Sequence, residues 1–250
     1  KLSQEPKDGA KTKTSESNKS LYKLWPRELN FYAGTYYNQR FINGSNSKIA
    51  QLVDNHDVIT STNVLGFNAE YNLKKSIFAQ LGFQWMSVNS TVQNYTIQKI
   101  NLRQETVVDP GGSTYTRDVY DTTNIAISGG KNSNQYFEIP LTVGARWQIK
   151  RHIIQPQFGV VTSFYTSGRG LSFTNTGELQ AVNKRQERLA NLNLQIITGF
   201  SYTYMVSPKL GLYINPNLRY GITNQAKKSF GFGEYNSMIG GQVGVKYILK

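Results

Sequence analysis

The sequence predicts an all-β protein: an eight-stranded, antiparallel, up-and-down β-barrel that crosses a membrane, with short turns at one end and long loops at the other. Apolar and polar residues alternate along eight segments, and the connections between these segments alternate between short and long. Composition agrees, because 16 Tyr, 12 Phe and 22 Gly suit strands and turns better than helices.

The clearest alternation covers residues 137–149. Every odd position from Phe137 to Ile149 is apolar, and no even position carries a large apolar side chain. A period of two predicts a strand with two chemically different faces. Seven further segments repeat the pattern, at residues 29–38, 64–73, 77–88, 153–165, 192–204, 212–222 and 239–249.

The connections divide into two classes. Those around residues 74–76, 150–152 and 205–209 are tight, whereas long ones cover residues 39–63, 89–135, 166–190 and 223–237. Outer-membrane barrels place short turns in the periplasm and long loops outside the cell. We therefore expect an outer-membrane location with both termini periplasmic. Alternation resumes over residues 93–107, which predicts a hairpin that extends two strands beyond the membrane.

The polar positions of the strands are mainly Gly, Asn, Gln, Ser and Thr. A soluble barrel of the lipocalin kind also alternates, but its water-facing surface is normally rich in charged residues. The polar face is therefore expected inside and the apolar face against lipid. Aromatic residues near strand ends predict a membrane–water girdle, with Tyr71, Trp147, Tyr204 and Tyr247 near the turns and Tyr37, Trp85, Phe164 and Tyr220 near the loops.

Charged residues also occupy the polar face within the strands. These five are Glu70, Glu138, Arg146, Arg219 and Lys246. We expect them to pair, because an unpaired buried charge is costly. An interior network that fills the lumen is favoured over an ion path, since eight strands leave room only for side chains.

The chain divides into residues 1–28, predicted to be a flexible periplasmic tail or tether, and residues 29–250, the barrel. A formal net charge of +13 would suit nucleic acid, but the Lys and Arg residues fall in the tail, turns and loops. Membrane lipid and lipopolysaccharide are the expected partners instead. Lys184, Arg185 and Arg188, in the third long loop, are the candidates for lipopolysaccharide contact.

No catalytic, cofactor or metal site is predicted. The absence of Cys excludes disulfides and thiol chemistry. His56 stands between Asp54 and Asp57 but has no nucleophile motif beside it, and His152 lies in a basic turn. A lipid-A-active enzyme is consequently the least favoured function.

Several motifs carry a family resemblance. Residues 136–141 are Tyr-Phe-Glu-Ile-Pro-Leu, residues 144–147 are Gly-Ala-Arg-Trp, residues 154–159 are Ile-Gln-Pro-Gln-Phe-Gly, and residues 32–34 are Tyr-Ala-Gly. In this combination the chain resembles the outer-membrane β-barrel domain of Bacteroidota, a group that includes PorT-like barrels of the small OmpA/OmpX type.

Two roles are expected. The first follows from the filled lumen and the long loops: a non-enzymatic anchor or scaffold in an outer-membrane assembly, with contacts to other outer-membrane or periplasmic proteins through long loops or the barrel wall. The second follows from the resemblance. The alternative is the C-terminal barrel of a trans-envelope, anti-sigma-type signalling protein that relays a surface signal through the N-terminal tether.

Overall fold

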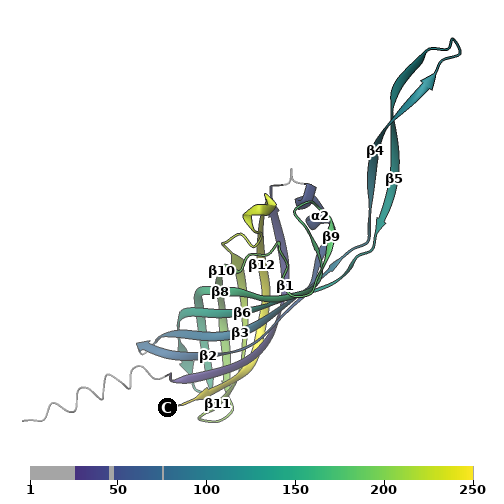
Figure 1. The fold of residues 1–250 in the computed structure, drawn as a ribbon. Coiled ribbons are helices and arrows are strands. Elements are labelled where there is room, and N and C mark those ends of the chain that lie inside the picture. The colour runs from purple at the N-terminus through teal and green to yellow at the C-terminus, as the bar shows by residue number, and fades with distance from the viewer. Residues whose placement is uncertain (1–25, 45–47, 75, 250) are drawn as a thin grey trace, which may run out of the picture.

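Eight long strands form a closed antiparallel barrel in the computed structural model, which describes residues 26–44, 48–74 and 76–249. Each strand pairs with the next along the chain, and β1 pairs with β12 to close the barrel (Figure 1). The predicted fold class is confirmed. The eight strands are β1 (Glu28–Asn43), β2 (Asp57–Lys74), β3 (Ile77–Val92), β6 (Gly130–Ala145), β8 (His152–Phe173), β10 (Leu192–Met205), β11 (Leu210–Gly221) and β12 (Gly233–Ile248).

Most strands run further toward the long-loop end than the alternation predicts. β8 has 22 residues, which corresponds to roughly 70 Å at about 3.3 Å per residue. A hydrocarbon core of about 30 Å needs only about 10 residues of a tilted strand. The barrel therefore rises above the membrane, and its strand extensions do not keep the regular alternation of the membrane-spanning parts.

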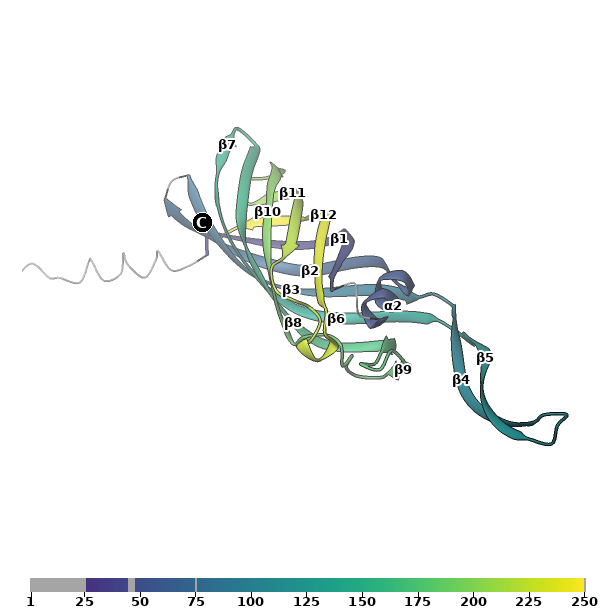
Figure 2. The same cartoon turned by 90° about the horizontal axis from the view of Figure 1, so that it is seen from above.

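Strand β1 begins at Glu28, one residue before the predicted start of the barrel at residue 29. The predicted division into a tail and a barrel stays a prediction, and residues 1–25 of the tail lie outside the described residues. The predicted strand over residues 137–149 is interrupted at Arg146, after which β7 (Trp147–Ile149) pairs with β8 alone (Figure 2). The Arg146 side chain pairs with interior carboxylates, and its backbone N–H donates to Ser76 at 2.8 Å.

Smaller elements cover the long-loop end of the barrel. They are α2 (Lys48–His56), β9 (Leu179–Val182) and the 3-10 turn η2 (Lys228–Phe230). A separate apolar cluster joins these elements to the barrel and includes Val53 of α2, Phe173 of β8 and Phe230 of η2. The helix α2 was predicted as loop. Among the described residues, no helix is long and apolar enough to span a membrane.

The two faces of the barrel wall have opposite chemistry. The largest fully buried side chains include Arg219 and Lys246, whereas Leu65 on the outside is 67% exposed and Val243 is 61% exposed. A protein in water is stabilised by burying its apolar surface. A barrel wall that leaves its apolar side chains exposed therefore suits lipid as its surroundings. The barrel is a transmembrane one, polar within and apolar without.

Candidate functional site

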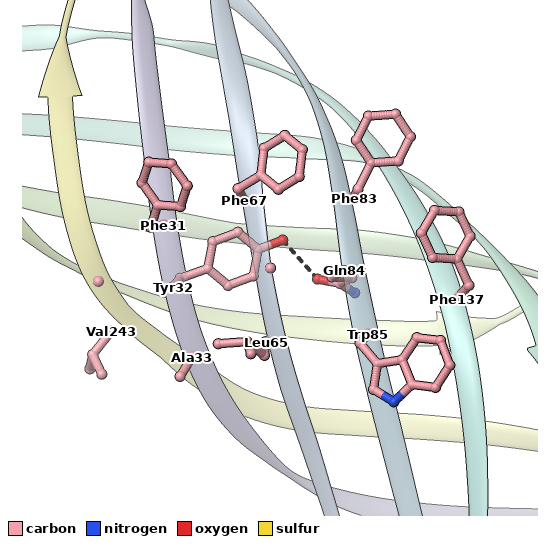
Figure 3. Close-up of a pocket in the computed structure, with 12 residues that line it drawn as sticks. Phe31, Tyr32, Ala33, Leu65, Phe67, Phe83, Gln84, Trp85, Phe137 and Val243 are labelled. Carbon is pink, nitrogen blue, oxygen red and sulfur yellow. Dashed lines mark hydrogen bonds between the residues drawn. The ribbon is translucent and has the colours of Figure 1, made fainter.

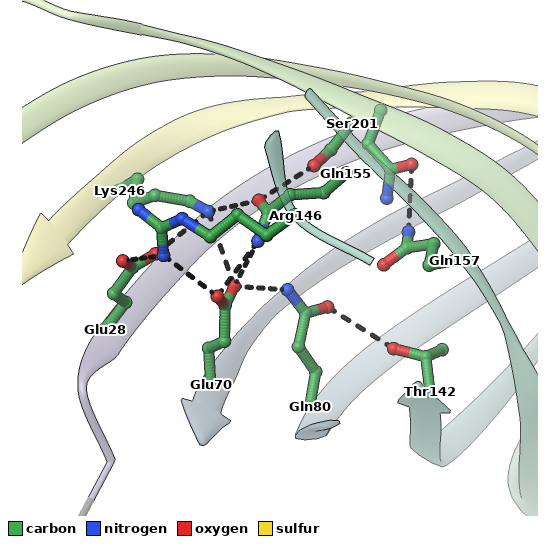
Figure 4. Close-up of polar contacts among 10 residues, drawn as sticks. Glu28, Glu70, Gln80, Thr142, Arg146, Gln155, Gln157, Ser201 and Lys246 are labelled. Carbon is green, nitrogen blue, oxygen red and sulfur yellow. Dashed lines mark hydrogen bonds and ion pairs between the residues drawn. The ribbon is translucent and has the colours of Figure 1, made fainter. Parts of the chain in front are cut away.

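The turn-end cluster consists of Glu28, Glu70, Arg146 and Lys246, at the end of the barrel that holds the short turns (Figure 4). Glu70 lies 3.2 Å from Arg146 and 3.4 Å from Lys246, and Glu28 contacts both cations. Gln155 donates to both Glu70 oxygens and accepts from Lys246 Nζ at 2.6 Å. Two acids and two bases make this cluster formally neutral.

The central cluster is built on Glu138 and Arg219, which lie 2.9 Å apart and are almost completely buried. The Arg219 guanidinium also donates to the Tyr36 hydroxyl at 2.8 Å and lies 4.4 Å from the centre of the Tyr36 ring. Gln84 and Ser163 donate to the Glu138 carboxylate. Hydrogen bonds to the ionised carboxylate stabilise its charge.

The loop-end cluster consists of Arg40, Asp57, Arg188 and Glu234. Arg40 lies 3.2 Å from Asp57 and 3.1 Å from Glu234, and Arg188 contacts the same two carboxylates. Three of these residues come from barrel strands, whereas Arg188 comes from the segment between β9 and β10. Arg188 thereby ties this loop into the mouth of the barrel.

Together the clusters fill the lumen with balanced charge. Five acids and five bases pair within the described residues. Two cavities between the turn-end and central clusters measure only about 10 Å³ each, roughly the space that one water molecule needs. Within the part of the chain that the structure describes, the interior has the chemistry of a plug.

The five charged residues predicted for the interior all lie there, divided between the turn-end and central clusters. The prediction missed Glu28 and the whole loop-end cluster. Glu28 stands one position before the predicted first strand, on the interior parity shared by Asn30 and Tyr32. This shared parity is the sequence signal that could have placed Glu28 in the interior.

The candidates for lipopolysaccharide contact do not form one surface. Lys184 and Arg185 are exposed, but Arg188 is 3% exposed and held by Asp57 and Glu234. The prediction that Arg188 contacts lipopolysaccharide was therefore wrong, because its side chain is buried and paired with two carboxylates. Contact through Lys184 and Arg185 stays a prediction.

The predicted girdle residues lie on the outer wall, seven of them exposed and Tyr71 half-buried. The indole N–H of Trp85 donates to Gln135 at 2.6 Å, and the girdle itself stays a prediction. Gln135 belongs to a row of directly paired outward residues, Thr35, Asn63, Ser87 and Gln135, that crosses four strands. This polar row indicates where the hydrocarbon ends on this side of the barrel.

Below the polar row, four Phe rings form a ladder across β1, β2, β3 and β6 (Figure 3). Neighbouring ring centres of Phe31, Phe67, Phe83 and Phe137 are 5.5–6.2 Å apart. The ladder borders a shallow depression of about 640 Å³ that is almost entirely apolar. Such a surface suits contact with acyl chains.

The hairpin of β4 (Tyr95–Val108) and β5 (Thr114–Ile127) is a separate two-stranded sheet beyond the barrel (Figures 1 and 2). A hairpin is therefore present in the second long loop, at residues 95–127. At its root, the Tyr95 ring stacks on the His56 ring with their centres 4.5 Å apart, and the Phe173 ring centre is 5.9 Å from that of Tyr95. Burial there raises the pKa of the Tyr95 hydroxyl.

The residues considered for catalysis are dispersed. His56 takes part in the hairpin root, His152 shares a 2.7 Å hydrogen bond with the Tyr202 hydroxyl, and Asp57 belongs to the loop-end cluster. Asp54 is exposed on α2. Within the described ranges, no group of three or more His, Cys, Asp or Glu side chains could hold a metal ion.

Neither a protein-family model nor a curated protein matches the sequence. Similar solved structures include the outer membrane protease OmpT from Escherichia coli, with 10% identity, coverage of 89% of this chain and 96% of that chain, and a TM-score of 0.45. Ail, the attachment invasion locus protein of Yersinia pestis, has 10% identity, coverage of 89% and 99%, and a TM-score of 0.32. The translocator domain of the autotransporter NalP from Neisseria meningitidis has 11% identity, coverage of 88% and 86%, and a TM-score of 0.29.

Identities and TM-scores this low bring no activity, ligand or partner to this chain. The fold assignment rests on the strand pairing and on the two faces of the barrel wall.

Proposed function

We propose that this protein is a non-enzymatic outer-membrane anchor whose barrel displays the β4–β5 hairpin for contact with other proteins. One observation carries the proposal: the lumen is filled by neutral charge clusters, while two 14-residue strands stand exposed beyond it. A sealed barrel offers no transport path. Loops of this size, when ordered, usually carry function.

The location and orientation follow from the same features. A barrel with an apolar wall, tight turns at one end and long loops at the other matches outer-membrane proteins, whose short turns are periplasmic. Leu249 N–H donates to Arg27 C=O at 2.8 Å. The start of β1 and the end of β12 therefore lie side by side, on the short-turn side of the barrel. In this orientation both ends are periplasmic and the hairpin is outside the cell, beside lipopolysaccharide. Membership of the Bacteroidota barrel family belongs to the same proposal and rests on the sequence motifs.

A second candidate function is the signalling barrel. The observation in its favour is that β1 starts at the short-turn end, so the preceding segment would enter the periplasm there. This candidate predicts a periplasmic binding partner for residues 1–25. Capture of a partner by the barrel without those residues would argue against it.

The test of the anchor function is removal of residues 95–127. The shortened barrel is expected to remain folded, with faster gel migration before heating than after, because β4 and β5 pair with each other in a sheet separate from the barrel. It should no longer retain a stoichiometric protein partner that the full chain retains in mild detergent. Retention of the same partner by the shortened chain would refute display through the hairpin.

A further inference from the structure

The outer edge of β5 has no strand beside it. β4 and β5 pair only with each other, in an unbroken register from Tyr95–Ile127 to Val108–Thr114. Isolated two-stranded ribbons are marginal in water, and three or more strands with a hydrophobic face are needed for independent stability. β5 also lacks the proline and the bulge that commonly protect exposed edges from pairing. The ribbon is therefore suited to receive another strand.

The two faces of the ribbon differ. One face carries ion pairs between Arg103 and Asp121, 3.4 Å apart, and between Arg117 and Glu105, 3.0 Å apart. The opposite face carries three strongly exposed apolar side chains, Ile100 at 60%, Leu102 at 59% and Tyr120 at 68%, beside the hydrogen bond between Gln104 and Asp118. The ion-pair face also exposes Tyr115, which is 52% exposed. A wider sheet would give the apolar side chains of both faces more neighbours.

The backbone geometry fixes which β5 residues can bond outward. At the tip, Asp109 N–H donates to Ser113 C=O at 2.8 Å. Hydrogen-bonded pairs alternate along an antiparallel ladder, so odd residues of β5 bond inward to β4. The N–H and C=O groups of even residues, such as Asp118 and Tyr120, face outward.

The β5 sequence is complementary to itself in one of the antiparallel registers that these outward groups allow. When two β5 strands run antiparallel about Val119, Arg117 lies opposite Asp121 of the second copy, and Asp121 lies opposite its Arg117. Even residues then form the hydrogen-bonded pairs, and odd residues form the pairs whose side chains come closest, with Cα atoms about 4.5 Å apart. Each Arg117 would stand between Glu105 of its own chain and Asp121 of the second copy.

We propose that β5 pairs with β5 of a second copy of this chain to form a four-stranded sheet, with the two barrels in facing membranes. β5 runs from the tip toward the barrel, and the hairpin points away from the end that holds the C-terminus (Figure 1). Antiparallel pairing therefore places the two barrels at opposite ends of the sheet. The inference rests on the proposed display of the hairpin and names its partner.

A single cysteine tests the register, because the native chain has none. Val119→Cys places two thiols opposite each other on the two-fold axis, within the Cα separation of about 4.4–6.8 Å that a disulfide accepts. Mild oxidation of the full chain in detergent should give a covalent dimer. Val107→Cys, on the same face but on β4, is the matched control and should stay monomeric. Equal dimer yields from the two variants, or none from Val119→Cys, would refute the pairing.

Charge reversal tests the facing arrangement in proteoliposomes of phosphatidylcholine. Vesicles that carry the wild-type chain should cluster, measured by light scattering and by energy transfer between two dye-labelled populations. Asp121→Arg alone or Arg117→Asp alone brings like charges together, and clustering should fall about tenfold or more. Mixing Asp121→Arg vesicles with Arg117→Asp vesicles should restore it between the populations, because each reversed residue then meets its opposite charge.

Asp109→Arg is the control reversal, since Asp109 lies at the tip outside β5, and this variant should cluster like the wild type. Clustering that survives both single reversals, or that mixing fails to restore, would overturn the proposal. The anchor function would still stand if the vesicles fail to cluster while removal of residues 95–127 abolishes binding of a different protein partner. A chain that stays soluble and monomeric without detergent would instead refute the anchor itself.

Discussion

Each buried charge in the barrel has a partner of opposite sign, and this pairing explains how a narrow lumen tolerates ten ionisable side chains. Taking an ion out of water costs several kcal/mol, which only close pairing and further hydrogen bonds offset. Glu138 shows both, because Arg219 pairs with it while Gln84 and Ser163 donate to it.

Arg219→Met should therefore lower the free energy of unfolding by about 3–5 kcal/mol, since it leaves Glu138 buried without its cation. The double variant Glu138→Gln with Arg219→Met should recover most of that loss. Urea unfolding in detergent, followed by tryptophan fluorescence, measures both. Arg103→Met, in the exposed ion pair of the hairpin, is the control and should cost no more than about 1 kcal/mol. Equal losses in the single and double variants would contradict the pairing account.

At the scale of elements, the polar row and the Phe ladder divide the outer wall into a part above the hydrocarbon and a part within it. Both features lie on β2, where Asn63 and Phe67 point outward from the same face. Asn63 is flanked by Thr35 and Ser87, whereas Phe67 is flanked by Phe31 and Phe83. The boundary thus falls between these two positions.

Phe67→Arg is accordingly expected to destabilise the folded barrel in lipid bilayers by about 2–4 kcal/mol, the cost of an arginine within the hydrocarbon, whereas Asn63→Arg should cost about 0–1 kcal/mol. Reversible urea unfolding in phosphatidylcholine vesicles measures the difference. Equal effects of the two substitutions would place the boundary elsewhere.

Arg188 is one of the links between the third long loop and the barrel mouth, beside backbone bonds such as Gln186 N–H to the Tyr165 hydroxyl. Arg188→Ala leaves Asp57 and Glu234 with Arg40 as their one remaining cation in the cluster. The loop should then detach more often and be cut faster by thermolysin, while the barrel persists. Arg169→Ala, an exposed arginine on β8, is the control. Unchanged cleavage in Arg188→Ala would show that the loop is held by other contacts.

At the scale of the whole molecule, the alternation was sufficient to predict the barrel and its two faces. The parity rule also located the five predicted charges, because position along a strand determines which way a side chain points. It could not find Arg188 or the start of β2 at Asp57, since these residues join the lumen through loops and strand extensions that do not keep the regular alternation. Arg146, directly after the end of β6, pairs with Glu28 and Glu70 from strands far away in the sequence, which no local pattern encodes.

The central claim, a membrane-anchored barrel that displays its hairpin outside the cell, is tested most directly by cysteine labelling on intact cells. A side chain added at Gly111, in the hairpin tip, meets nothing within 4 Å, and Lys209 lies in the short turn between β10 and β11. A membrane-impermeant maleimide should label Gly111→Cys on intact cells and Lys209→Cys only after the outer membrane is opened. Labelling of Lys209→Cys on intact cells, or protection of Gly111→Cys, would contradict the account.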